Sequence, residues 1–168
     1  MARVALVTGG SRGIGAAISL GLQAAGCQVA ATYAGNEAAA ASFKAATGIS
    51  VFKWDVADAA ACQAGIAAVE AELGPVEILV NYAGITRHAA FHRMSLEQWQ
   101  QVMSTNVDSL FTMTRPVWEG MRARKFGRVI SISSRSFLRK LRRSCLDCSS
   151  PRASHCAMRT CNASISRE

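Results

Sequence analysis

Short apolar runs alternate with longer segments of mixed polarity along most of the chain. The runs are rich in Val and Ile and too short for helices, which predicts strands at residues 3–8, 28–33, 50–54, 77–81 and 128–133. Between them, apolar residues recur at helical spacing, which predicts helices over residues 13–26, 36–47, 58–73 and 95–125. In the first helix we expect one buried face, made of Ile14, Ala17, Ile18 and Leu22.

Two helix boundaries carry their own signals. Ser95 stands three residues before Gln98 at the start of the longest predicted helix, and this spacing is typical of a capping box. Gly74 and Pro75 follow the preceding helix, and both residue types end helices. We therefore expect the longest helix to begin immediately after Ser95.

The predicted strands are apolar along almost their whole length, which indicates burial on both faces and therefore parallel pairing under two layers of helices. Repeated alternation of strand and helix gives an α/β fold, a Rossmann-type doubly wound parallel sheet with right-handed crossovers. No apolar run approaches the roughly 18–20 residues of a membrane span. The N-terminus does not resemble a signal peptide, because Gly9 and Gly10 interrupt its apolar stretch. We expect a soluble, cytoplasmic protein with no membrane partner.

Charge is distributed unevenly within the formal net charge of +8. Residues 1–134 hold 11 Lys and Arg against 9 Asp and Glu, whereas residues 135–168 hold 8 against 2. Four of the six cysteines also fall in the second segment. We predict two parts: a nucleotide-binding domain over 1–134 and an irregular, basic, disordered tail over 135–168. Because most of the excess charge belongs to the tail, the first part needs no nucleic-acid partner.

A glycine-rich turn joins the first predicted strand to the first helix, with the sequence Thr-Gly-Gly-Ser-Arg-Gly-Ile-Gly over residues 8–15. Glycines at this place allow a tight turn and let the backbone approach a pyrophosphate, whose charge lies at the helix N-terminus. Glycines also end strands for purely structural reasons. The position between first strand and first helix favours nucleotide binding.

The end of the second strand predicts which nucleotide is bound. An NAD site places Asp or Glu there, on the ribose 2′-hydroxyl. This chain has no carboxylate before Glu37, and Arg12 lies in the glycine-rich turn, where a cation meets a 2′-phosphate. We therefore expect NADP as cofactor; a solvated turn residue is the alternative role for Arg12.

Several motifs occur together in one order: Gly9-xxx-Gly13-x-Gly15, Asp55-Val56, Asn81-Tyr82-Ala83-Gly84, Asn106 and Ile132-Ser133-Ser134. In this order they resemble the short-chain dehydrogenase/reductase family over residues 1–134. Shorter stretches, such as residues 83–87 and 125–130, resemble its acetoacetyl-CoA reductase members. The resemblance implies NADPH-dependent reduction of a 3-oxoacyl-CoA, acetoacetyl-CoA to 3-hydroxybutanoyl-CoA, in a homotetramer. It also implies that the sheet is truncated after its fifth strand.

The resemblance assigns roles to individual residues. Those expected to bind the cofactor are Gly9, Arg12, Gly13, Ile14, Gly15, Asp55, Val56, Asn81, Ala83 and Gly84. Within this set, Asp55 would accept a hydrogen bond from the adenine amino group, with Val56 beside the ring. Asn106 would hold a proton-relay water, and Ser134 would bind the substrate carbonyl oxygen, which makes these two the catalytic candidates. As structural alternatives, Asp55 caps the following helix and Asn106 bends its own.

Two departures from the family pattern lie close to the motifs. Tyr82 replaces a small Asn, which places a backbone-positioning hydrogen bond in question. His88 follows the Thr-Arg pair where relatives usually carry Asp. We interpret it as an exposed loop histidine; a group on the substrate side of the site is the alternative.

The family's catalytic Tyr-xxx-Lys element is missing. Its expected positions hold Asp147 and Pro151, and Lys140 is the sole lysine after residue 134. The two tyrosines of the chain are Tyr33 and Tyr82. The chemistry needs a general acid for the carbonyl oxygen, so we expect impaired or absent activity. We also expect poor solubility, because the fifth strand lacks its neighbour. We expect no native tetramer, because the resemblance implies that the helix over 95–125 packs in the tetramer against a helix that starts at the missing Tyr.

The cysteine-rich tail supports a different hypothesis: a non-catalytic nucleotide-binding remnant that binds zinc or a partner. Four candidate zinc ligands occur in a short span, Cys145, Cys148, His155 and Cys161, although their spacing fits no zinc knuckle well. We expect no metal in the site. A frameshifted or misjoined reading frame is the alternative explanation for residues 135–168.

Overall fold

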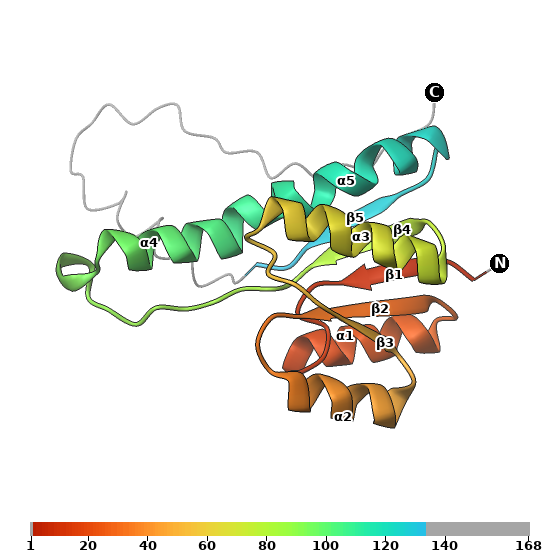
Figure 1. The fold of residues 1–168 in the computed structure, drawn as a ribbon, viewed down its shortest axis with the longest axis horizontal. Helices are drawn as coiled ribbons and strands as arrows, with labels where there is room; N and C mark the ends of the chain where they lie inside the picture. The colour runs from red at the N-terminus through yellow and green to blue at the C-terminus, as the bar shows by residue number, and fades with distance from the viewer. Residues whose placement is uncertain (1, 134–168) are drawn as a thin grey trace, which may run out of the picture. The chain divides into compact units, whose positions relative to one another are not determined.

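The structure, a computed structural model, describes residues 2–133, which form a parallel sheet flanked by helices (Figure 1). The strands are β1 (Val4–Val7), β2 (Gln28–Tyr33), β3 (Ser50–Lys53), β4 (Val76–Asn81) and β5 (Arg128–Ser131). They pair in the order β3-β2-β1-β4-β5, and every pairing is parallel. This is the predicted Rossmann-type α/β architecture.

Helices cover both faces of the sheet, α1 and α2 on one side and α3 and α5 on the other (Figure 1). They are α1 (Gly13–Ala24), α2 (Glu37–Thr47), α3 (Ala59–Leu73), α4 (Leu96–Met103) and α5 (Ser109–Ala123). A 3-10 turn, η1 (Phe91–Arg93), precedes α4, and a π-helical turn, η2 (Ser104–Asp108), joins α4 to α5. The helix predicted over 95–125 therefore forms as two α-helices, α4 and α5, joined by a π-helical turn.

The core lies in two layers, because side chains alternate between the two faces of a strand. On the α3 and α5 side, Leu6 and Leu79 pack with Met113 and Val117. On the α1 and α2 side, the buried residues are Ala5, Val7, Val29, Ala31, Ile49 and Val80. The central strands are thus covered on both faces, as their continuous apolar sequence predicts.

Strand β5 differs from the central strands, because all four of its residues are exposed. Val129 and Ile130 are 39% and 44% exposed, respectively. β5 is an edge strand, hydrogen-bonded only to β4 within residues 2–133. An apolar sequence at an edge leaves unpaired backbone groups beside exposed apolar side chains, which favours association with other chains.

Helix α1 corrects the predicted buried face. Gly15 and Ser19 are its buried residues, and Ile18 and Leu22 pack beside them against the sheet. Ile14 is 62% exposed and Ala17 is exposed, so the prediction was wrong for these two. The small residues Gly15 and Ser19 let the helix lie close to the strands, and this turns Ile14 outward.

The helix boundaries follow their sequence signals. The Ser95 hydroxyl accepts a hydrogen bond from the Gln98 N–H at 3.2 Å, and the Gln98 side chain accepts one from the Ser95 N–H at 3.1 Å. The predicted capping box is confirmed. Asn36 and Asp58 cap α2 and α3 through their side chains. Within residues 2–133, no helix combines the length and apolar character that crossing a bilayer requires.

Candidate functional site

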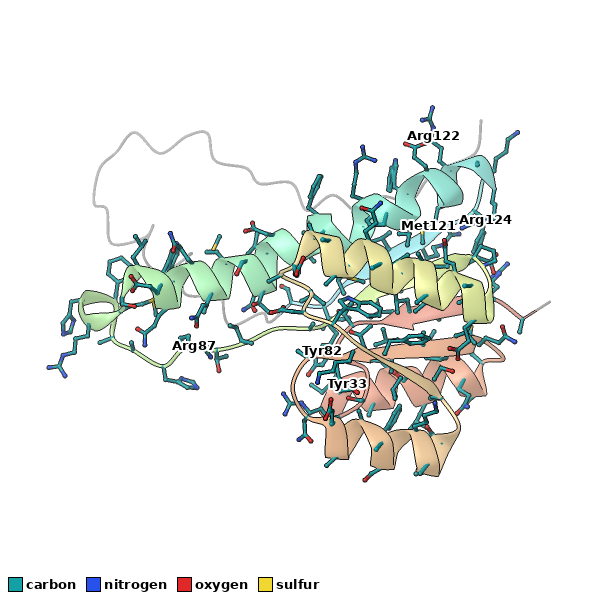
Figure 2. The ribbon with its side chains drawn as sticks, in the orientation of Figure 1. Tyr33, Tyr82, Arg87, Met121, Arg122 and Arg124 are labelled. Atoms are coloured by element: carbon teal, nitrogen blue, oxygen red, sulfur yellow. The ribbon has the colours of Figure 1, made fainter. Side chains whose placement is uncertain are left out.

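A cleft of about 460 Å³ lies where the strands end at their carboxyl edge. Its walls are the turn after β1, residues 32–36 at the end of β2 and just beyond it, residues 54–57 after β3, and residues 83–85 and 87 after β4, with part of α4 and η2. The chain leaves β1 toward β2 on one side and reaches β4 on the other, which makes this edge a topological switch point. Ligands of open α/β sheets bind at such points. In Figure 2, Tyr33 and Tyr82 lie near this edge and Arg87 lies on the segment leading to α4.

The geometry of the glycine-rich turn restricts four of its positions to glycine, either by a positive φ (Gly9 and Gly13) or by lack of space for a Cβ (Gly10 and Gly15). Gly9 has φ +65°, in the left-handed region. A Cβ on Gly15 would lie 2.1 Å from the Gly9 carbonyl oxygen, so α1 begins in direct contact with the turn. The Ser19 hydroxyl donates to the Gly10 carbonyl at 3.0 Å, and the Gly9 N–H donates to the Thr32 hydroxyl at 3.3 Å.

The predicted residues of this turn divide into two groups. Gly9 and Arg12 line the cleft, and Arg12 is exposed at the N-cap position of α1 without a side-chain capping bond. Gly13, Ile14 and Gly15 form the first turn of α1 and do not line the cleft. Their part is to bring the helix N-terminus to the edge of the cleft.

Asp55 and Val56 both line the cleft, and Val56 is buried. The Asp55 carboxylate accepts a hydrogen bond from the Ala57 N–H at 2.9 Å, within its own turn. Asp58, instead, caps α3 by accepting from the N–H groups of Ala60 and Ala61 at 2.9 and 3.1 Å. The alternative in which Asp55 caps the helix is therefore wrong.

Thr8 organises the wall that follows β4, a role that sequence analysis missed. Its hydroxyl oxygen accepts hydrogen bonds from the N–H groups of Tyr82 and Ala83, both at 2.9 Å, and donates to the Val80 carbonyl at 3.4 Å. This threonine is a buried polar residue at the end of an apolar strand, which is the signal that marks it. The backbone beside Tyr82 is thus positioned despite the loss of the family's Asn.

The motif after β4 places two of its predicted residues in the cleft and one outside it. Ala83 and Gly84 line the cleft. Asn81 is buried and does not line it, and its Nδ2 has no hydrogen-bond partner within residues 2–133. The Tyr82 ring packs toward Gly15 with the α1-side core, away from the cleft lining.

Asn106 lies in the π-helical turn and binds the segment after β4. Its Oδ1 accepts from the Ile85 N–H at 2.8 Å, and its Nδ2 donates to the Ile85 carbonyl at 2.9 Å. Its place in an irregular helical turn agrees with the structural alternative, whereas its role in holding a proton-relay water stays a prediction. The other catalytic candidate, Ser134, lies outside the described residues, as do the zinc-ligand candidates of the tail.

The charged residues of the cleft lining are Arg12, Arg87 and Asp55, which favours an anionic ligand. Sequence analysis missed Arg87, whose Nε donates to the Gln101 Oε1 at 3.0 Å. Glu37, the first carboxylate after β2, is paired with Lys53 and does not line the cleft. The hydrogen bond and charge of Lys53 lower the pKa of Glu37 below its ordinary value. His88 is exposed, as expected.

A sheet of this order with a glycine-rich turn at its switch point defines a nucleotide-binding fold of the Rossmann type. The sequence model of the short chain dehydrogenase family matches residues 3–164. The chain belongs to the short-chain dehydrogenase family.

Among its relatives is an acetoacetyl-CoA reductase of Shinella zoogloeoides, 64% identical over 134 residues, which are 80% of this chain and 56% of that protein. An acetoacetyl-CoA reductase of Paracoccus denitrificans is 63% identical, with 80% and 55% covered. The 3-oxoacyl-[acyl-carrier-protein] reductase FabG of Escherichia coli K12 is 39% identical, with 79% and 54% covered. The chain spans about half the length of these curated relatives.

Proposed function

We propose that residues 1–134 of this chain are the NADP-binding part of an acetoacetyl-CoA reductase, an enzyme that reduces a 3-oxoacyl-CoA to the 3-hydroxyacyl-CoA. The observation that carries the proposal is the cleft at the switch point, with Arg12 in its glycine-rich turn and no carboxylate from the end of β2 in its lining. The identity of 62–64% with three acetoacetyl-CoA reductases supports the choice of substrate.

The cleft suits a dinucleotide in size and chemistry. Its volume of about 460 Å³ falls within the range of small-molecule sites. Residues 9, 83 and 84 are glycine or alanine, so no large side chain projects into the cleft from these walls. A Cβ added at Gly9 would lie 3.2 Å from the Ala83 backbone. The N-terminus of α1 adds the favourable end of a helix dipole for a pyrophosphate.

The same residues favour NADP over NAD. A 2′-phosphate beside Arg12 would gain a charge-assisted hydrogen bond. The carboxylate best placed by sequence to bind a 2′-hydroxyl, Glu37, is engaged by Lys53. Repulsion between a free carboxylate and a 2′-phosphate is thereby avoided. Asp55 and Val56 would form the adenine side, and Ala83 and Gly84 would pass the ribose.

Bound NADPH supplies the hydride for reduction of the substrate carbonyl. Asn106 would hold a proton-relay water, and Ser134 would hydrogen-bond the carbonyl oxygen. A general acid is also needed, and the two tyrosines within these 168 residues do not supply one in the family's Tyr-xxx-Lys context. Tyr33, the last residue of β2, lines the cleft, and Tyr82 packs against Gly15. We therefore propose that these residues by themselves bind cofactor but reduce substrate poorly or not at all.

Three further parts of the proposal concern the chain as a whole. The predicted division at residue 134 concerns a tail that lies outside the described residues. The protein acts in the cytoplasm, and the homotetramer of the family is not formed by these 168 residues alone. Size-exclusion chromatography tests the last point. A monodisperse tetramer would contradict it.

Binding of NADPH and NADH to the 168-residue chain, measured by isothermal titration calorimetry, tests the cofactor. We expect tighter binding of NADPH, and in Arg12→Met a loss of about tenfold or more in NADPH affinity, since a charge-assisted bond is removed. NADH affinity should change little. Equal loss for both nucleotides, or no binding by the wild type, would overturn the assignment. In a separate assay, NADPH consumption with acetoacetyl-CoA should stay at background.

A further inference from the structure

A buried carbonyl group fixes the wall of the cleft that follows β3. The carbonyl oxygen of Val56 lies outside any helix or strand, and Val56 is 5% exposed. Within residues 2–133, its hydrogen-bond donors are two side chains from other elements. The Thr112 hydroxyl on α5 donates at 2.7 Å, and the Cys62 thiol on α3 donates at 3.4 Å.

Thr112 is the principal donor of the two. Its Oγ1 also lies 3.2 Å from the Ser109 carbonyl, one turn earlier on α5, but the Val56 oxygen is nearer. The Cys62 thiol is a weak donor with three acceptors in reach. Its Sγ lies 3.4 Å from the Val56 carbonyl oxygen, 3.7 Å from that of Asp55 and 3.8 Å from the Thr112 hydroxyl. Loss of the Thr112 hydroxyl would therefore leave a buried acceptor with a thiol alone.

The carbonyl that Thr112 holds belongs to the peptide that forms the cleft wall. Asp55 and Val56 both line the cleft, and a peptide unit is planar, so holding the Val56 oxygen limits how the Val56–Ala57 unit can rotate. Ala57 also lines the cleft, and its N–H, in that same unit, donates to the Asp55 carboxylate. The position of the Asp55 side chain thus depends on the same backbone.

Thr112 and Asn106 lie on the same helical stretch, and each side chain hydrogen-bonds the backbone of one cleft wall. Asn106 in η2 binds the backbone of Ile85 on the wall after β4, and Thr112 in α5 binds the backbone of Val56 on the wall after β3. A single helical support thereby fixes two walls of one cleft that come from distant parts of the sequence.

We propose that Thr112 is a positioning residue for nucleotide binding: its hydroxyl holds the Val56 carbonyl and so sets the Asp55–Val56 wall for the adenine end of the ligand. This inference rests on the proposed nucleotide site. It predicts that the hydroxyl, and not the bulk of the side chain, matters for affinity, and that the effect is confined to the adenine end.

The test compares Thr112→Val, which keeps the shape and removes the hydroxyl, with Thr112→Ser, which keeps the hydroxyl. Thr114→Val is the matched control, because Thr114 is a half-buried threonine of α5 without a side-chain hydrogen bond in residues 2–133. Binding of NADPH and of adenosine 2′,5′-bisphosphate to the full chain is measured by calorimetry, and folding is checked by the thermal midpoint.

We expect T112V to weaken both ligands by the same factor, about five- to tenfold, as loss of one hydrogen bond to a buried acceptor implies. T112S and T114V should bind as the wild type does. Unchanged binding by folded T112V, failure of T112S to restore it, or a loss for NADPH without a loss for the bisphosphate would each overturn the inference. If T112V does not fold, Thr112→Ala is judged by the same criteria. A wild-type chain that binds neither ligand overturns the proposed function together with this inference.

Discussion

The side chain of Asn106 forms two hydrogen bonds with the backbone of Ile85, accepting from its N–H at 2.8 Å and donating to its carbonyl at 2.9 Å. The two residues are 21 positions apart, on the π-helical turn and on the segment after β4. Such a two-point contact restrains one peptide segment in position and orientation, which single-point contacts do not.

Asn106→Ala should release this segment. We expect a loss of about 1 kcal/mol in the free energy of unfolding, because the exposed partners regain hydrogen bonds to water, and faster amide exchange at Ile85. NADPH affinity should also fall, since Ala83 and Gly84 lie in the same wall. Urea unfolding measures the change in stability, and hydrogen exchange monitored by NMR measures the change at the Ile85 amide. Val107→Ala, the neighbouring exposed residue of η2, is the control, and an equal increase of Ile85 exchange in V107A would contradict the prediction.

Gly15→Ala should disrupt the glycine-rich turn, because the new Cβ would lie 2.1 Å from the Gly9 carbonyl oxygen. Backbone on both sides must shift, and we expect a loss of about 3 kcal/mol or more together with loss of nucleotide binding. Urea unfolding measures the change.

Gly21→Ala provides the matched control on the same helix. A Cβ there meets nothing within 4 Å. Alanine has the higher helix propensity, so G21A should stabilise the chain by up to about 1 kcal/mol. Similar losses for the two variants would mean that the contact with Gly9 is not the cause.

Asp55→Ala and Asp58→Ala should separate binding from stability. Asp58 caps α3 with two hydrogen bonds, so D58A is expected to lower the free energy of unfolding by about 1 kcal/mol and leave NADPH affinity almost unchanged. D55A is expected to weaken NADPH more than it lowers stability, since Asp55 lines the cleft. Calorimetric binding and urea unfolding of both variants test this. If D58A weakened NADPH binding and D55A lowered only stability, Asp55 would not be the nucleotide contact.

Lys53→Met should show a stability difference that depends on pH. The pKa of Glu37 is lowered from 4.5 by the hydrogen bond and charge of Lys53, so its stabilising contribution is present above pH 4.5 and is lost as the pH falls through the lowered value. The pKa of Lys53 is raised from 10.5 by Glu37, so its contribution is present below pH 10.5 and is lost as the pH rises through the raised value.

The thermal midpoints of wild type and K53M should therefore differ slightly between these limits and converge outside them. Both side chains are exposed, so added salt should shrink the difference. Lys44→Met removes a lysine that has no ion pair within residues 2–133 and controls for the loss of charge. A K53M difference that stays constant with pH would rule out the pair as its source.

The sheet and its helices were predictable because buried parallel strands leave continuous apolar runs. Residues 28–33 were predicted as a strand and form β2 with the same bounds. The buried face of α1 was mispredicted because hydrophobicity was weighed above size. Gly15 and Ser19 face the sheet for the space they save, and Ile14 faces solvent.

The cleft was predictable only where one local segment carries the signal. Arg12 and Asp55 follow strands within motifs, whereas Thr8 and Thr112 act on backbone 74 and 56 residues away. A polar residue at the end of an apolar strand marks Thr8, but the neighbouring sequence does not identify the distant backbone that either hydroxyl binds. The bend at Asn106 was stated only as an alternative, and the π-helical form was not predicted because residues 104–108 continue the polarity of an ordinary helix.

The strand order also affects how the chain folds. β1 lies between β2, which follows it closely in the sequence, and β4. The Thr8 hydroxyl, just after β1, donates a hydrogen bond to the carbonyl of Val80 in β4, 72 residues further along the chain. Loop closure over that length slows folding. During synthesis, β1 and β2 can therefore pair long before β4 has emerged. Until it does, one edge of the most buried strand in the sheet is open, and this interval is when the growing chain most needs protection from aggregation.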